Sequence, residues 1–261
     1  RDGSTGRHSS LSGAGATSAI IGYLAPFMKE PAKFLGEKDA LELEKALGEI
    51  KTKYPKESAA LSQWLDSIQV RIQEGKKQKE AGNLEASKKS YDRGESEMRR
   101  LLAQVSERDR AEQAFRELED TKARLGASPA FRDRPNLLTW IALEKEKDAS
   151  DAFAKNDFSG ARILCGLLVR IHRLSPKAVD EAAGLAALRD LTASIRGEAV
   201  AAEAPAKQAW LFERAKAEED GAGEKAREGL VPRAAEQYVL ASFLFEKAKE
   251  VALESAGAGR D

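Results

Sequence analysis

Apolar residues recur at steps of three and four along most of the chain, a spacing that places them on one face of an α-helix. The strict alternation of apolar and polar residues that marks a half-buried strand is not sustained anywhere in the sequence. Short segments that contain Pro or Gly interrupt the helical pattern. From Leu41 onward, the sequence therefore predicts an all-α protein whose helices are separated by turns and short linkers.

One pattern occurs three times, at 82–94, 156–168 and 229–241, with spacings of 74 and 73 residues. Each copy begins with Gly or Asn, which tolerate the positive φ at a helix end. Apolar and small residues follow at helical steps, and another small residue precedes the turn by seven positions. These positions hold Gly75, Gly82, Leu84, Ser87, Tyr91 and Gly94 in the first copy, Ala149, Asn156, Phe158, Ala161, Cys165 and Leu168 in the second, and Ala222, Gly229, Val231, Ala234, Tyr238 and Ala241 in the third. The pattern predicts two antiparallel helices that approach closely and are joined by a tight turn.

This pattern resembles the tetratricopeptide repeat (TPR), which has a small residue, Gly, an aromatic, Ala, an aromatic and Ala at this spacing. The third copy, from Ala222 to Ala241, fits it best. The resemblance implies antiparallel helical hairpins arranged as a TPR-like α-solenoid or an elongated bundle. The family's closing Pro is absent, and its period is about 34 residues, whereas the period here is about twice that length.

The longer period leaves room for a third helix in each repeat. We expect this helix at 107–126 in the first repeat, after a break near Val105, and at 178–197 in the second, after Ser175-Pro176. A linker that contains Pro follows each third helix, at 127–136 and 199–207. Three helices per period fit either a distorted array or a bundle, and the sequence alone favours neither.

The helical repeat domain is expected to span 37–255, with units at about 57–126, 134–197 and 205–255. Within it, the Tyr54-Pro55 pair should end one helix, and Ser58 should cap the next. A tryptophan follows each linker, and most of these aromatic residues are expected in the core. The three tryptophans are Trp64, Trp140 and Trp210.

The terminal segments have a different composition from the repeat domain. Residues 1–17 are rich in Gly and Ser and predict a flexible tether. Residues 18–36 include the apolar run AIIGYLAPF, which would pack on the first repeat, contact a partner or a membrane, or stay disordered. Residues 256–261 are expected to be a disordered tail.

The distribution of charge limits the classes of molecule that the protein is expected to bind. Basic and acidic side chains number 43 each, and they are mixed along the chain without a basic block, so the composition argues against nucleic-acid binding. Proteins are the expected partners, as a peptide or a helix held in a groove. A Gly/Ser tether ahead of a helical domain suits a lipid-anchored bacterial lipoprotein, so we favour a periplasmic or envelope-anchored location over the cytoplasm, with membrane association through an anchor outside this sequence.

The candidates for chemistry are few. Cys165 occupies a packing position of the repeat and is expected to be buried. His8 falls in the tether, and His172 is expected on a polar helix face. We interpret the acidic run at 218–220 as a solvated helix end and the charged run at 144–148 as a solvated helix face. The glycines at 13 and 15 match a phosphate-binding loop only weakly. We therefore predict no catalytic, cofactor-binding or metal-binding residue and no cofactor, and the sequence does not specify the residues that bind a partner.

These observations favour a non-enzymatic protein–protein interaction scaffold, as a subunit or adaptor of a larger envelope-associated assembly. Two other functions stay open. One is a structural subunit of a filament or motor complex. The other is a helical carrier with an apolar cavity for a small molecule or lipid.

Overall fold

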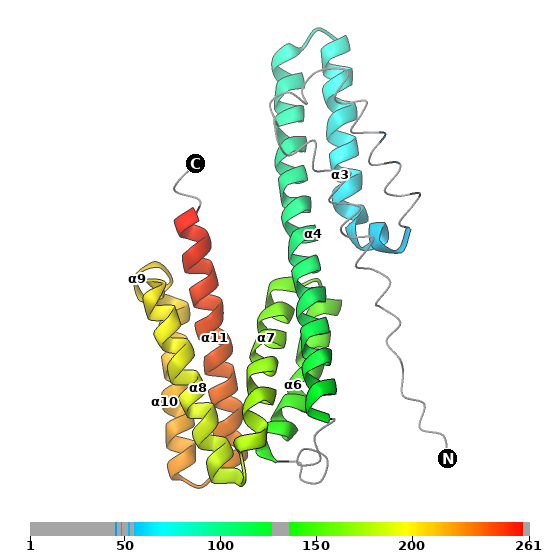
Figure 1. Ribbon diagram of the computed structural model, residues 1–261. Coiled ribbons are helices and arrows are strands. Elements are labelled where there is room, and N and C mark those ends of the chain that lie inside the picture. The colour runs from blue at the N-terminus through cyan, green and yellow to red at the C-terminus, as the bar shows by residue number, and fades with distance from the viewer. Residues whose placement is uncertain (1–44, 46–47, 49–51, 53–54, 127–135, 258–261) are drawn as a thin grey trace, which may run out of the picture. The chain divides into compact units, whose positions relative to one another are not determined.

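The computed structural model describes residues 45, 48, 52, 55–126 and 136–257. These residues are almost entirely helical and contain no strand, which confirms the all-α prediction (Figure 1). The chain divides within α4 into two compact units, 1–110 and 111–261. The elements are α3 (Pro55–Glu80), α4 (Leu84–Gly126), α6 (Leu137–Ala154), α7 (Phe158–Leu174), the 3₁₀ helix η2 (Ser175–Lys177), α8 (Glu181–Ala201), α9 (Ala204–Lys207), α10 (Ala209–Arg227) and α11 (Val231–Gly257). The predicted tether at 1–17, the segment at 18–36 and most of the linker at 127–136 lie outside the described residues.

Three helical hairpins, α3–α4, α6–α7 and α10–α11, share one turn geometry. The turn residues Gly82, Asn156 and Gly229 have φ angles of 80°, 62° and 77°. In each turn, this residue donates its N–H to the carbonyl three positions earlier, and the next residue donates to the carbonyl five positions earlier. These bonds form the Schellman motif, which satisfies carbonyls that a helix end otherwise leaves unpaired. They are Gly82 to Lys79 (3.0 Å) and Asn83 to Gln78 (2.8 Å), Asn156 to Phe153 (3.0 Å) and Asp157 to Ala152 (2.9 Å), and Gly229 to Ala226 (3.1 Å) and Leu230 to Lys225 (2.9 Å).

The residue that closes each Schellman motif also begins the next helix. The carbonyls of Asn83, Asp157 and Leu230 accept the N–H groups of Ser87, Ala161 and Ala234 at 2.9, 3.0 and 3.0 Å. Each hairpin therefore changes direction over three residues, with no residue in the turn that serves only as a spacer.

Small residues allow the paired helices to approach, as the pattern predicts. A methyl group at Gly75 would lie 2.7 Å from the Tyr91 ring, and the Ser87 hydroxyl donates to the Gly75 carbonyl at 2.8 Å. The corresponding residues of the other hairpins are also buried, and they are Ala149, Ala161 and Cys165, and Ala222, Ala234 and Tyr238. Leu84 departs from the pattern, because it is 68% exposed at the first position of α4.

The predicted break near Val105 is wrong, because α4 continues as one helix from Leu84 to Gly126. No Pro or Gly stands between Glu95 and Leu125, so nothing there ends a helix. Pro176 does interrupt the second repeat, where α7 gives way to η2 and then α8. The first repeat therefore has two helices where three were expected.

Two other predicted helix boundaries are corrected. Ser58 is not an N-cap, because α3 already begins at Pro55, and Pro is well suited to a first helical position. Gly197 does not end α8, which continues to Ala201. The left-handed residue after α8 is Glu203, with a φ of 60°.

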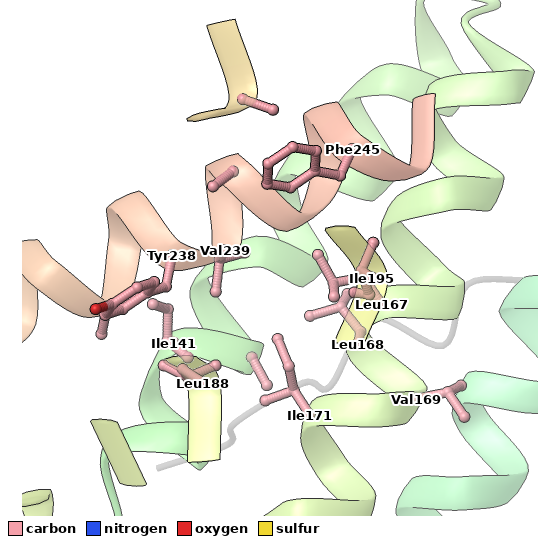
Figure 2. Packing of buried hydrophobic residues seen from close by; sticks show 14 of the residues in the cluster. Ile141, Leu167, Leu168, Val169, Ile171, Leu188, Ile195, Tyr238, Val239 and Phe245 are labelled. Carbon is pink, nitrogen blue, oxygen red and sulfur yellow. The ribbon is translucent and has the colours of Figure 1, made fainter. Parts of the chain in front are cut away.

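The C-terminal unit has a continuous apolar core, which α6, α7, α8, α10 and α11 all contribute to (Figure 2). Phe212 of α10 meets Phe245 of α11 edge-to-face, with ring centroids 5.2 Å apart. The Thr192 hydroxyl of α8 lies 2.9 Å from the Ser242 hydroxyl and donates to the Tyr238 carbonyl at 3.2 Å, both on α11. The helix α8 thus packs beside α11 of the third hairpin.

A partly buried polar cluster fixes the start of α6 to the connection between α7 and α8. The side chain of Asn136 caps α6 by accepting the Thr139 N–H at 3.1 Å. Its amide group donates to the carbonyls of Ser175 at 2.7 Å and Ala178 at 3.0 Å. The hydroxyl groups of Thr139 and Ser175 lie 2.9 Å apart. Each of these partly buried polar groups therefore has a partner within the protein.

Candidate functional site

His172 is the buried member of a polar triad with two partly exposed residues, Glu146 and Lys122, which corrects the prediction that it stands on a polar helix face. Its side chain is almost fully buried, and its Nε2 lies 3.3 Å from Oε1 of Glu146 on α6. Lys122 of α4 donates to Oε2 of the same carboxylate at 2.7 Å. Glu146 belongs to the charged run at 144–148, so that run is only partly the solvated face that was expected.

The pKa values of the triad follow from these contacts. Burial raises the pKa of Glu146, but the hydrogen bonds with His172 and Lys122 lower it by more than burial raises it. The net pKa therefore lies below the usual 4.5. Burial lowers the pKa of Lys122, but Glu146 and Glu119 outweigh this effect and raise it above 10.5. Both ionic forms are therefore stabilised at neutral pH. Because its imidazole is enclosed, His172 is positioned to join helices rather than to reach a substrate.

Cys165 is fully buried in the core of the C-terminal unit, as its place in the repeat predicts. Burial, with smaller contributions from the charges of Glu146 and Glu119, raises the pKa of its thiol to about 12. The thiolate is the form that acts as a nucleophile or binds a metal. At neutral pH, this side chain therefore acts as a small apolar group.

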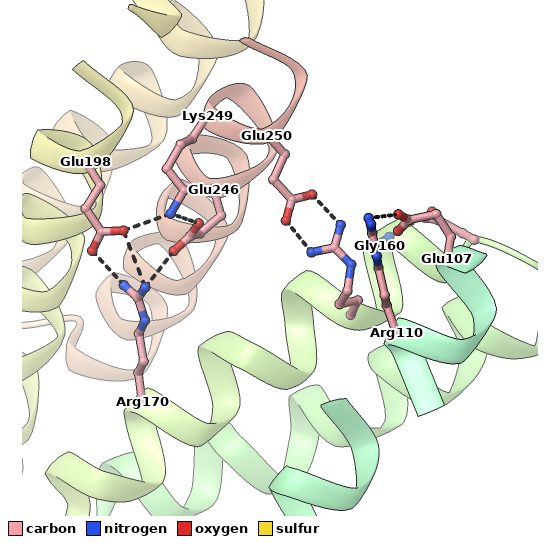
Figure 3. Close-up of polar contacts among 10 residues, drawn as sticks. Glu107, Arg110, Gly160, Arg170, Glu198, Glu246, Lys249 and Glu250 are labelled. Atoms are coloured by element: carbon pink, nitrogen blue, oxygen red, sulfur yellow. Dashed lines mark hydrogen bonds and ion pairs between the residues drawn. The ribbon is translucent and has the colours of Figure 1, made fainter. Parts of the chain in front are cut away.

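Charged side chains link α7, α8 and α11 in a closed network (Figure 3). Arg170 of α7 pairs with Glu198 of α8 at 3.0 Å and with Glu246 of α11 at 3.2 Å. Lys249 of α11 pairs with the same two carboxylates at 2.8 and 2.5 Å. Next to it, Arg162 donates to Glu250 through Nη1 and Nη2, at 2.5 and 2.9 Å.

The contacts within this network stabilise the ionised form of Glu198. Burial raises the pKa of Glu198, but hydrogen bonds from Lys249 and Arg170 lower it to a net value below the usual range. The positive and negative charges balance, so the network offers no net charge to a ligand. Its contacts instead connect helices that are far apart in the sequence.

The acidic run at 218–220 lies inside α10 rather than at a helix end. Glu219 accepts a hydrogen bond from Arg196 of α8 at 2.9 Å. In the described residues, no three His, Cys, Asp or Glu side chains are grouped so that they could hold a metal ion. Within the described ranges, no helix has an apolar stretch long enough to cross a bilayer. His8 and the glycines at 13 and 15 lie outside the description.

The clearest candidate for a binding surface includes a tryptophan. Two of the three tryptophans are exposed, so the expectation that they lie in the core is wrong for them. Trp140 of α6 is 46% exposed, and Trp210 of α10 is 72% exposed. Leu143, one turn after Trp140 on the same face, is 56% exposed. We call Trp140 and Leu143 the α6 apolar face. Two adjacent large apolar side chains left in water are a feature that partner-binding surfaces share. The side chain of Trp64 lies outside the description.

Alignment of the three turns could have identified these positions in advance. The residue sixteen places before the turn is Asp66, Trp140 or Glu213, and all three are exposed. The residue sixteen places after the turn is Met98, His172 or Phe245, and all three are buried. Trp140 therefore stands at a surface position and His172 at a core position.

Comparison with protein-family models, with curated proteins and with solved structures yields no match for this chain.

Proposed function

We propose that this chain is a non-enzymatic scaffold that binds other proteins through TPR-like hairpins, as a subunit or adaptor of a larger assembly. The observation that carries the proposal is the α6 apolar face, where Trp140 and Leu143 stay exposed on a helix whose opposite side is tightly packed. Tryptophan is among the residues that most often dominate binding energy at protein interfaces.

The shared turn supports the TPR-like part of the proposal. Three hairpins with the same Schellman bonds and the same buried small residues are what a repeated helical unit requires. The unbroken α4 and the additional helix α8 are departures that such a scaffold accommodates between its hairpins.

The state of the polar groups supports binding over catalysis. Cys165 and His172 are enclosed, and the charges beside them are already paired with protein groups. A partner that covers the α6 apolar face would bury the exposed half of Trp140 and of Leu143, worth roughly 1 kcal/mol for each side chain.

The proposal is tested by affinity purification from the source cells with quantitative mass spectrometry. Wild type is compared with the double variant Trp140→Ser/Leu143→Ser and with Leu253→Ser, a control whose side chain is also mostly exposed but lies on α11. We expect one reproducible set of proteins with wild type and with the control, and its loss with the double variant. Equal recovery with all three proteins, or no reproducible partner, would contradict the proposal. Circular dichroism verifies that each variant keeps its helical content.

A further inference from the structure

The turn at Gly82 brings two short basic stretches to one end of the α3–α4 hairpin. We call residues 76–93 the basic tip. They contain six basic and three acidic side chains, a net charge of +3. The same window around the other two turns, 150–167 and 223–240, has a net charge of zero in each case. The sequence has no continuous basic block, so the charge becomes concentrated only when α3 and α4 pair.

The basic tip is open to solvent and has an exposed apolar residue next to its turn. Every residue from Lys79 to Ala86 is exposed, and Leu84 is 68% exposed at the first position of α4. Lys77 and Lys88 are exposed on the two helices on either side of the turn. An exposed leucine at a turn with lysines on the two helices that flank it suits a surface that is negatively charged outside and apolar beneath.

We propose that the basic tip binds the surface of an anionic lipid bilayer, with the lysines at the headgroups and Leu84 in the interface. This activity goes beyond the proposed protein-binding function and uses a different part of the chain. Clusters of four to eight basic residues favour anionic membranes, and each residue near the surface strengthens binding about fivefold.

Two features favour a membrane over other anionic partners. Five of the six basic residues are Lys, which acts as a point charge, whereas recognition of defined carboxylates or phosphates more often uses the planar Arg. The tip's one aromatic residue, Tyr91, is buried against Gly75, so it offers no ring on which a nucleic-acid base could stack.

The test uses the full chain and sedimentation with vesicles of phosphatidylcholine alone or with roughly 30% phosphatidylserine. The tip variant is Lys77→Glu/Lys88→Glu. The matched control is Lys147→Glu/Arg233→Glu, which changes the net charge equally at exposed residues outside the tip. A third variant, Leu84→Ser, tests the apolar contact.

We expect wild type and the control to bind the anionic vesicles alike, and added salt to release them because it screens exposed charges. The tip variant should bind at least ~10-fold more weakly, and Leu84→Ser a few-fold more weakly. Three outcomes would overturn the proposal. They are no preference for anionic vesicles, equal losses in the tip variant and the control, and binding of polyglutamate or RNA but not of vesicles. Matching circular dichroism spectra would exclude unfolding as the cause of a loss.

Discussion

The α3–α4 and α10–α11 hairpins have the same turn but different packing around it. In the first, Gly75 lies so close to Tyr91 that no side chain fits between them. In the third, Ala222 takes the place of Gly75, and α8 packs against α11 through Thr192. The comparison teaches that the turn determines where the chain reverses, whereas the residues along the helices determine how firmly the pair is held.

The largest expected effect comes from the residue sixteen places after the turn. Phe245→Ala would remove a fully buried ring that contacts Phe212, and it should lower the free energy of unfolding by about 3–5 kcal/mol. Met98→Ala, at the same place in the first hairpin, should cost less, about 2 kcal/mol. Chemical denaturation measures both. A larger loss for Met98→Ala than for Phe245→Ala would mean that the first hairpin depends more strongly on this position than the third.

The next effect tests which face of α11 is packed. Ala234 is fully buried, whereas Glu236 is partly exposed. Ala234→Trp would force the paired helices apart and should cost at least ~1–3 kcal/mol. Glu236→Trp should cost well under that amount. Similar losses at both positions in denaturation curves would mean that this face does not hold α10 and α11 together.

A smaller effect tests whether the three turns are equivalent. Gly82→Ala and Gly229→Ala would each place a Cβ at a positive φ, which should cost about 1 kcal/mol, while Asn156→Gly should cost little or nothing. Thermal unfolding followed by circular dichroism compares the three variants. A loss at Gly229 without one at Gly82 would show that the first hairpin does not depend on its turn.

The smallest effect concerns acid stability. The folded pKa of Glu146 lies below its usual 4.5, so the carboxylate contributes stability that is complete above about pH 4.5 and is lost as the pH falls through the folded pKa. The difference in unfolding free energy between wild type and Glu146→Gln, below ~1 kcal/mol for a partly exposed group, should therefore shrink below pH 4.5. Denaturation at pH 7 and at lower pH measures it. A difference that does not change with pH would rule out the ionised carboxylate as its source.

The sequence predicted the turns and the small buried residues because both depend on local chemistry. Positive φ selects Gly or Asn, and a close helix pair selects residues such as Gly75 and Ala234. The predicted break near Val105 was wrong because it was inferred from the length of the repeat. The sequence near Val105 has no Pro or Gly that would end a helix. Helix ends without Pro or Gly, such as that of α8, have no strong sequence marker.

The candidate site was harder to predict from local sequence. Glu146 and His172 are 26 residues apart, and only the fold of the α6–α7 hairpin brings them together. Helical spacing places Trp140 and Leu143 on one face of α6, but it does not reveal that both side chains stay about half exposed among the residues that the structure describes. Burial of a whole helix face depends on its neighbours, which one helix does not encode.

In each hairpin, the residue that closes the first helix also begins the second. Adding one residue to such a turn would rotate the following helix by about 100°. In α11, that rotation would move the buried residues Ala234, Tyr238 and Ala241 out of the core together. Over evolution, relatives of this protein should therefore keep the lengths of these three turns fixed. Insertions and deletions should instead accumulate where one hairpin is joined to the next.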